Sequence, residues 1–334
     1  MDLPLALKLA LEELTEENQT AQLYEDAQNI SSRYRNQSGK GERLLTADSE
    51  ALAYAAVRMP ATFGAVSAAL SEVLELWGEK PAALLDVGAG TGAASWAADA
   101  LLELSSVVCA EREEAMRHTG QALMQVGSPA LQNAKWRACD LTQEGFAQQV
   151  LVDSTGKPEL VIASYVLNEL TEDTRKKAAL QLWELTGGML LLVEPGTPEA
   201  FRQLSGIRTL LVEAGAFLAA PCPQDRACPL AEGDWCHFTC RVMRSRLHRY
   251  LKDGAAPYED EKFSYLAFTR TPCRRAEARI LRHPRISPGV VSLKLCTGQG
   301  LAACEVRKRD GAQFKAARKA KCGDSFFGLD PSQP

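Results

Sequence analysis

The stretch Leu85-Asp-Val-Gly-Ala-Gly-Thr-Gly92 decides the fold of this 334-residue chain. A short apolar run, 83–87, leads into it, and a helix-like segment, 93–102, follows it. Glycines at such a junction let the backbone turn sharply and approach a nucleotide-like ligand without a clash from a Cβ atom. The stretch therefore predicts a strand, a ligand-binding turn and a helix.

Further apolar runs alternate with helix-like segments between residues 82 and 193. The expected strands are Ala83–Val87, Ser106–Ala110, Ala134–Ala138, Leu160–Ser164 and Met189–Val193. Alternation of this kind is typical of a parallel sheet covered by helices. The segment 80–196 resembles the class I methyltransferase fold, an α/β fold with a Rossmann-like sheet.

The residues of the turn favour S-adenosylmethionine as the ligand. Asp86 precedes Gly88, Gly90 and Gly92, and we expect its carboxylate to approach the cationic methionine end of the ligand, directly or through water. A nicotinamide dinucleotide is the rival, because Gly88, Gly90 and Ala93 also fit the dinucleotide fingerprint. An acid at this place would repel its pyrophosphate. A turn required only for strand–helix packing is the third interpretation.

Polar residues after the later strands complete the predicted ligand site. Glu111 ends the second strand and is placed to accept hydrogen bonds from the ribose hydroxyls, and Asp140 can receive the adenine amino group. Asn168 and Glu169 follow the fourth strand and are candidates for the pocket wall, although Asn168 can equally cap a helix. The Pro-Pro-aromatic turn of amino-directed base methyltransferases is missing there, so the sequence identifies no catalytic residue.

A cysteine-rich segment follows the expected sheet. Cys222, Cys228 and Cys236 lie within fifteen residues of a polar, proline-interrupted stretch, which favours metal ligation over apolar packing. Their spacing differs from that of common zinc fingers and suits a thiolate-bound iron–sulfur cluster, with zinc as the alternative. The fourth ligand stays open at this point; the candidates are Cys240, Cys273, Cys296, Cys304 and His237.

The charge of the chain is divided unevenly. Residues 241–334 hold 20 Lys and Arg against 9 Asp and Glu, a net charge of +11, whereas the remainder carries −15. A basic tail on an acidic body indicates a surface for a polyanion, most often nucleic acid, and a well-solvated basic module is the plainer interpretation. No apolar run approaches the ~18 residues of a membrane span. The acidic start resembles neither a secretory signal nor a transit peptide, so we expect a cytoplasmic monomer without membrane contact.

These features predict four parts. Residues 1–78 form a helical extension, 79–218 the methyltransferase-like domain, 219–262 a cysteine-rich metal-binding insert and linker, and 263–334 a small basic β-rich module that binds RNA.

Several motifs together resemble one family, over about residues 50 to 325. They are Tyr54-Ala-Ala-Val-Arg-Met-Pro-Ala-Thr62, the glycine turn, Tyr165-Val-Leu-Asn-Glu-Leu170, Val193-Glu-Pro-Gly196 and the Pro-Cys…Cys-Pro…Trp-Cys-His-Phe stretch at 221–238. The chain resembles the bacterial branch of the mitochondrial small-ribosomal-subunit methyltransferase-like family. The resemblance implies a factor that binds the small ribosomal subunit or its rRNA and aids assembly or translation. It also implies a four-cysteine [4Fe-4S] cluster, with Cys296 as the best match to the distant ligand and Cys273 in reserve.

Three functions are compatible with these observations. The first is a ribosome-associated factor that binds S-adenosylmethionine and contacts rRNA phosphates through the basic residues Arg241, Arg244, Arg246, Arg249, Arg307, Lys308, Arg309, Lys315, Arg318 and Lys319. The second is an active rRNA methyltransferase. The third is a small-molecule methyltransferase with a zinc site, whose basic tail is only a lid.

Overall fold

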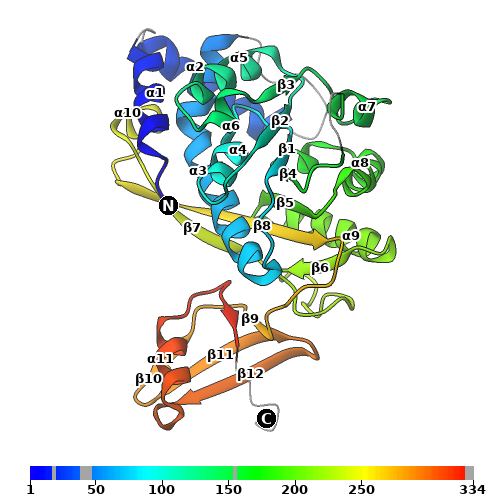
Figure 1. The fold of residues 1–334 in the computed structure, drawn as a ribbon. Helices are drawn as coiled ribbons and strands as arrows, with labels where there is room; N and C mark the ends of the chain where they lie inside the picture. The colour runs from blue at the N-terminus through cyan, green and yellow to red at the C-terminus, as the bar shows by residue number, and fades with distance from the viewer. Residues whose placement is uncertain (17–19, 38–46, 153–155, 328–334) are drawn as a thin grey trace.

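The computed structural model describes residues 1–16, 20–37, 47–152 and 156–327. An α/β body holds most of these residues, and a small β-rich module lies below it in the view of Figure 1. Helices α1 (Leu5–Glu16), α2 (Thr20–Gln37) and α3 (Asp48–Trp77) confirm the expected helical N-terminal segment. No helix among these residues has the length and apolar character needed to cross a membrane.

The body is built on one large sheet with the strand order β3-β2-β1-β4-β5-β8-β6, and β7 pairs with the first half of β8. Its strands are β1 (Ala83–Val87), β2 (Ser106–Ala110), β3 (Lys135–Arg137), β4 (Leu160–Ser164), β5 (Met189–Pro195), β6 (Phe217–Ala220), β7 (Phe238–Met243) and β8 (Tyr258–Thr269). Strands β1 to β5 are parallel, and β8 runs antiparallel to β5, β6 and β7. The five strands expected from the apolar runs are confirmed to within about two residues.

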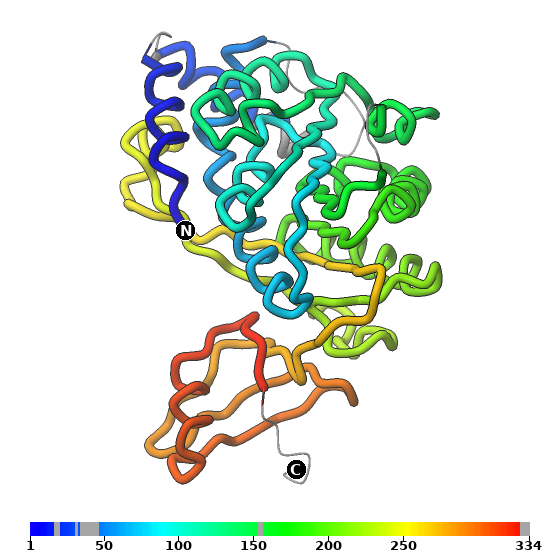
Figure 2. The backbone as a smooth tube through the Cα atoms, viewed as in Figure 1, coloured from blue at the N-terminus to red at the C-terminus, as the bar shows by residue number. Residues whose placement is uncertain are grey.

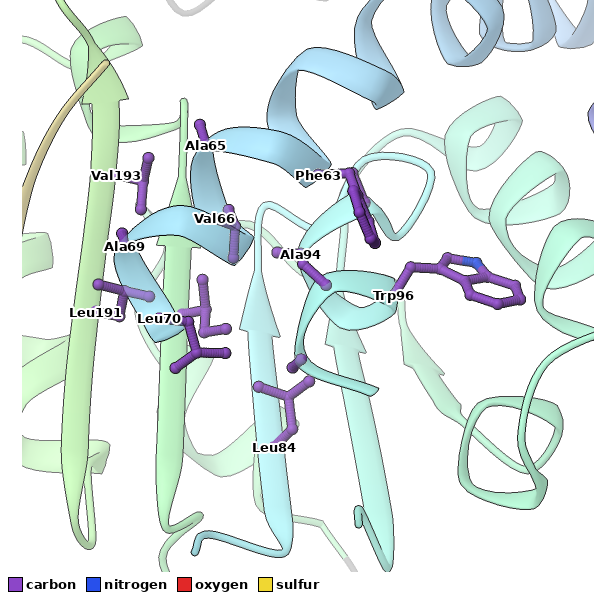
Figure 3. Close-up of a cluster of buried hydrophobic side chains, with 14 of the residues drawn as sticks. Phe63, Ala65, Val66, Ala69, Leu70, Leu84, Ala94, Trp96, Leu191 and Val193 are labelled. Atoms are coloured by element: carbon purple, nitrogen blue, oxygen red, sulfur yellow. The ribbon is translucent and has the colours of Figure 1, made fainter. Parts of the chain in front are cut away.

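Successive residues of each parallel strand face opposite layers of helices, because side chains alternate along a strand. Leu84 packs with α3 and α4 (Ala93–Asp99), whereas Leu85 belongs to the core on the other face. Figure 3 shows Leu84, Leu191 and Val193 against side chains of α3 and α4. The opposite face is covered by α7 (Phe146–Val150), α8 (Glu172–Leu185) and α9 (Pro198–Glu213). Both faces are therefore dry, which explains the nearly continuous apolar runs.

Shorter helices complete the body. They are α5 (Glu114–Met124), α6 (Pro129–Gln132) and α10 (Arg246–Leu251), together with a 3₁₀ turn at Leu167–Glu169. The long α3 is rich in alanine, which favours helix, and it continues through Pro60. It ends at Gly78, which adopts a left-handed conformation (φ 78°) and donates its backbone N–H to Leu74 O.

The C-terminal module has a sheet and a core of its own. Its strands are β9 (Ala278–Ile280), β10 (Arg285–Ser287), β11 (Val290–Thr297), β12 (Gly300–Arg307) and β13 (Ser325–Phe326), and α11 (Ala312–Lys319) packs against them. All the strand pairs of this sheet are antiparallel. The backbone trace enters the module through the segment after β8, which Figure 2 shows leaving the large sheet.

The expected domain boundary at residue 263 is wrong. Residues 263–269 form the half of β8 that lies between β5 and β6, so they complete the large sheet of the body. Strands β6 and β7 pair with the same β8, so both also belong to the body. The module begins only at Ala278, and the segment between β6 and β7 is a loop of the body.

Candidate functional site

The glycine turn forms one wall of a large open cavity at the carboxyl ends of the parallel strands. The cavity measures about 1090 Å³, counting the space at its mouth. Gly88 (φ 65°) lies against Val166, whose side chain would be 2.7 Å from an added Cβ, so packing alone requires glycine there. Gly90 (φ 55°) has open space where its Cβ would be. The turn thus leaves its backbone accessible to a ligand at Gly90.

Four of the seven predicted ligand residues line this cavity, namely Gly88, Gly90, Glu111 and Asp140. The Glu111 carboxylate accepts hydrogen bonds from Gly90 N (2.8 Å) and Glu113 N (2.8 Å), so it bridges the turn and the end of β2. Asp140 accepts from Thr142 N (2.8 Å) through Oδ1. Its Oδ2 lies 3.8 Å from Arg112 Nη1. The cavity is therefore rimmed by carboxylates at the two places where the sequence expects ribose and adenine contacts.

The prediction for Asp86 needs correction. Its side chain is fully buried behind the cavity wall, where Oδ2 accepts hydrogen bonds from Ser95 N (3.0 Å) and Ser95 Oγ (2.7 Å). Burial raises the pKa of Asp86 to about 6. The carboxylate holds the first turn of α4 in place, because strand alternation turns it toward that helix. It acts on the shape of the glycine turn and does not line the cavity, and its Oδ1 has no hydrogen-bond partner among the described residues.

Gly92 and Asn168 are likewise absent from the cavity lining. An added Cβ on Gly92 would lie 2.4 Å from the Met124 side chain, so this glycine serves packing. Asn168 lies in the 3₁₀ turn after β4, and its amide nitrogen donates to Tyr165 O (3.1 Å) and Glu194 Oε2 (2.9 Å). The Asn168 amide therefore stabilises the 3₁₀ turn. This role resembles the helix-capping role that the sequence offered as the alternative to ligand binding.

Several residues of the cavity wall were not among the predicted ligand residues. Tyr54, Met59 and Thr62 of α3 line it, although they lie more than twenty residues before the turn. Tyr165 also lines it, with a left-handed backbone (φ 58°), and its hydroxyl donates to Glu261 Oε1 (2.9 Å). The only signal for these positions is that two of the family motifs contain them. Tertiary packing of α3 over the sheet brings them to the cavity.

A buried carboxyl behind this wall predicts how stability depends on pH. Burial raises the pKa of Glu194 to about 8, although hydrogen bonds from the backbone N–H of Leu167 and Asn168 oppose the rise. Between its ordinary value of 4.5 and about 8, the folded chain keeps a proton that the unfolded chain releases, so the free energy of unfolding falls as pH increases. Glu194→Gln removes this ionisation. We expect urea unfolding to show a loss between pH 5 and pH 8 that is smaller by about 1–3 kcal/mol than in the unchanged protein.

Glu172→Gln serves as the control for this prediction. Glu172 is exposed and its pKa is lowered by a hydrogen bond from Lys176, so its replacement should leave the slope between pH 5 and pH 8 unchanged. Equal slopes for Glu194→Gln and the unchanged protein would contradict the prediction.

The structure brings the four predicted metal ligands to one place. Cys222, Cys228, Cys236 and Cys296 line a single, mostly apolar cavity between the body and the module. The first three come from the loop between β6 and β7, and Cys296 comes from β11. All ten cysteines are free thiols. In the described part of the chain, no group of three or more His, Cys, Asp or Glu side chains is arranged as a ready coordination site for a metal ion.

The alternative fourth ligands lie elsewhere. Cys240, Cys273, Cys304 and His237 are absent from the lining of this cavity. Cys273 follows β8, where Thr269 Oγ1 lies 3.8 Å from its sulfur. Cys304 lies on β12 against the core of the module. Cys296 is thus the candidate that shares a cavity with the loop cysteines.

Burial raises the pKa of three thiols of the cavity, Cys222, Cys236 and Cys296, so these three are protonated at neutral pH. Burial raises the pKa of Cys296 to about 11 and that of Cys236 further, and the neighbouring thiols add to both shifts. The guanidinium of Arg279 opposes both shifts, and that of Arg208 opposes the shift of Cys296. Ligation of a metal by these sulfurs would therefore release protons.

The ten basic residues proposed for RNA contact are not equivalent. Arg244 is largely buried and pairs with Glu259 (2.6 Å), and Arg241 pairs with Asp260 (2.8 Å). Arg241 and the remaining eight are exposed; these eight are Arg246, Arg249, Arg307, Lys308, Arg309, Lys315, Arg318 and Lys319. The Arg244 side chain must therefore be removed from the predicted contact set, because its charge is already neutralised inside the body.

The sheet order, with the reversed strand β8 inserted between β5 and β6, and the glycine turn after β1 define the class I methyltransferase fold. Residues 48–327 match the family described as "Mitochondrial small ribosomal subunit Rsm22", and the chain belongs to this family. This finding confirms the resemblance drawn from the motifs.

Individual relatives agree with this assignment. The chain is 27% identical over 313 residues to the human "Ribosome assembly protein METTL17, mitochondrial", covering 87% of this chain and 65% of that protein. It is 26% identical over 215 residues to "Rsm22-cox11 tandem protein 1, mitochondrial" of Schizosaccharomyces pombe, covering 50% of this chain and 29% of that protein. The chain thus spans less than two thirds of the length of these relatives.

Two solved structures align with the chain at low similarity. Magnesium protoporphyrin IX methyltransferase from Synechocystis, with bound SAM, aligns over 74% of this chain and 97% of its own, at 14% identity and a TM-score of 0.40. The plantazolicin methyltransferase BpumL, in complex with SAH, aligns over 79% of this chain and 99% of its own, at 12% identity and a TM-score of 0.40.

Proposed function

We propose that this protein is a ribosome assembly or translation factor that binds the small ribosomal subunit and its rRNA, holds S-adenosylmethionine at the glycine turn, and carries a four-thiolate metal centre. The observation that carries the proposal is the family match over residues 48–327, joined by a human relative named as a ribosome assembly protein. The three parts of the proposal use three different places in the structure, and each can be tested separately.

The charge of the turn cavity supports S-adenosylmethionine. The lining carries the carboxyl groups of Glu111, Glu113, Asp140 and Glu169 against the single guanidinium of Arg112. A sulfonium ligand brings a positive charge into this surrounding, whereas the pyrophosphate of a nicotinamide dinucleotide would bring negative charge. Burial raises the pKa of Glu169 to about 7, and a cationic ligand would favour its ionised form. Bound ligand and acidic wall thus stabilise each other.

The thiol cavity suits a metal centre by the chemistry of its donors. Four sulfurs line it, and none of the described residues contributes a carboxylate to the lining. Thiolates are the ligands of iron–sulfur clusters and of structural zinc. The Arg279 side chain is also buried there, and its Nη2 finds no hydrogen-bond acceptor within the described residues. We favour a [4Fe-4S] cluster, with zinc as the alternative, held by Cys222, Cys228, Cys236 and Cys296. Such a centre would join the loop of the body to β11 of the module.

The module supplies the surface for rRNA. Residues 278–327 contain 11 Lys and Arg against 3 Asp and Glu, a net charge of +8. Lys315, Arg318 and Lys319 are exposed on one short helix, α11, and extend the basic stretch at 307–309. Basic side chains that neutralise phosphates release counterions, so the binding they provide weakens as salt increases.

The rRNA contact predicts a charge-reversal result. The variant Lys315→Glu/Arg318→Glu/Lys319→Glu is expected to bind purified small-subunit rRNA at least about tenfold more weakly at low salt. Its plot of log affinity against log salt should be flatter by about two to three, because three phosphate contacts are removed. Filter binding at several salt concentrations measures both quantities. Lys157→Glu/Lys176→Glu/Lys177→Glu reverses three exposed charges of the body and is the matched control, and equal losses in the two variants would show a non-specific charge effect.

A further inference from the structure

The Arg279 side chain lies at the junction of the body, the module and the thiol cavity. Arg279 belongs to β9 of the module, and the residue is 1% exposed. Its Nε donates to Pro221 O (3.0 Å), and its Nη1 donates to Gly323 O (2.8 Å) and forms an ion pair with Glu72 of α3. Its Nη2 lacks a hydrogen-bond acceptor among the described residues, and the Phe238 ring lies 5.7 Å from the guanidinium carbon. One edge of a buried cation therefore remains unsatisfied.

A second arginine lines the same cavity. Arg208 of α9 is 4% exposed, and its Nη2 donates to Gln224 O (2.7 Å) and Arg226 O (2.6 Å), which holds the cysteine loop. Its Nε has no acceptor in the part of the chain that the structure describes. Both guanidinium groups thus border the four thiols. Arg279 forms an ion pair with Glu72, whereas the hydrogen bonds given above for Arg208 are to backbone carbonyls.

This charge distribution is costly when the cavity is empty, because a buried cation without full compensation is unfavourable. Four thiolates around a zinc ion, or around an oxidised [4Fe-4S] core of charge 2+, form a centre with a net charge of 2−. The guanidinium groups of Arg208 and Arg279 are opposite in charge to such a centre, although Glu72 already offsets part of the charge of Arg279.

We propose that Arg279 and Arg208 are the counterions of the thiolate-held centre, and that Arg279 links filling of this centre to docking of the module on α3. The inference rests on the proposed metal centre. A filled centre attracts the guanidinium of Arg279 on one side while Glu72 holds it on the other. The Ser325 hydroxyl of the module also donates to Glu72, so the same carboxylate receives two groups of the module.

The experiment compares two variants that break the same ion pair from opposite sides. Arg279→Gln removes the positive charge beside the centre. Glu72→Gln keeps that charge and removes the carboxylate that competes with the centre for the guanidinium. Both variants should loosen docking, measured as faster tryptic cleavage in the segment between β8 and β9. Only Arg279→Gln should lower metal retention against a chelator, by about tenfold, because loss of groups around metal ligands costs about 10- to 100-fold in affinity.

An iron centre allows a second measurement with opposite signs. Arg279→Gln should shift the midpoint potential of the cluster to a more negative value, and Glu72→Gln should shift it to a more positive one. Arg279→Lys keeps the charge and should restore metal retention. Equal retention and equal potentials in both glutamine variants would overturn the inference and leave a structural arginine. An unchanged protein that purifies anaerobically without stoichiometric iron or zinc would instead overturn the metal centre itself.

Discussion

A Cys296→Ser variant is expected to fail to hold the proposed metal centre and to dock its module only loosely on the body. Cys296 is the thiol that β11 contributes to the cavity, whereas Cys222, Cys228 and Cys236 belong to the loop of the body. A serine hydroxyl is a poor ligand for iron or zinc, so the centre would lose its link to the module. Since removal of groups around a ligand already costs about 10- to 100-fold in metal affinity, removal of a ligand should cost more.

Metal content after anaerobic purification and limited trypsin digestion measure the two effects. Visible charge-transfer absorption with iron identifies a cluster, and a colourless protein with zinc identifies the alternative. Digestion should release the module while the glycine-turn domain stays intact, because metal ligation contributes folding energy where the ligands lie. Cys304→Ser is the matched control, since Cys304 lies on the neighbouring strand β12 outside the cavity. If the two variants retain equal metal, Cys296 is not a ligand.

The sequence predicts the parallel part of the fold well, for a physical reason. Strands covered on both faces must be apolar along their whole length, so 83–87, 160–164 and 189–193 stand out as runs. Strand β8 is different. Its first half alternates between exposed and half-buried residues where it pairs with β7, and only its second half is continuously buried. The sequence of this one strand therefore resembles two different segments, and the expected domain boundary at residue 263 falls inside it.

The sequence alone predicts different amounts of the two candidate sites. Spacing groups Cys222, Cys228 and Cys236, because they are close along the chain. No local pattern connects them to Cys296, and only the family resemblance chose it over Cys273. The hydrogen bonds that Asp86 accepts from Ser95 could not be predicted either, since they depend on how the following helix packs on the strand. Contacts between distant segments decided each of these outcomes.

Gly90→Ala is expected to lower the affinity for S-adenosylmethionine and S-adenosylhomocysteine by about 10- to 100-fold. Gly90 lines the cavity, and the position of an added Cβ has nothing within 4 Å in the protein itself. The methyl group thus has room in the free protein but would project where the turn must approach its ligand closely. Extra methyl groups in a filled site typically cost 1–3 kcal/mol, which corresponds to this range of affinity. Isothermal titration calorimetry with each ligand measures the change, and a titration with NADH tests the rival nucleotide.

The strain of the substitution must be separated from its effect on the ligand. Gly90 has a φ of 55°, and a side chain in this conformation costs about 1–2 kcal/mol of stability. Gly215, in the turn before β6, also has a positive φ (83°) and open space around its Cβ position, but it lies outside the cavity. Gly215→Ala should therefore lose a similar free energy of unfolding and keep its ligand affinity. Unchanged affinity in Gly90→Ala would mean that the glycine turn serves strand–helix packing alone, and equal losses of affinity in both variants would trace the effect to stability. Weaker binding confined to Gly90→Ala is the result that a nucleoside site at this turn requires.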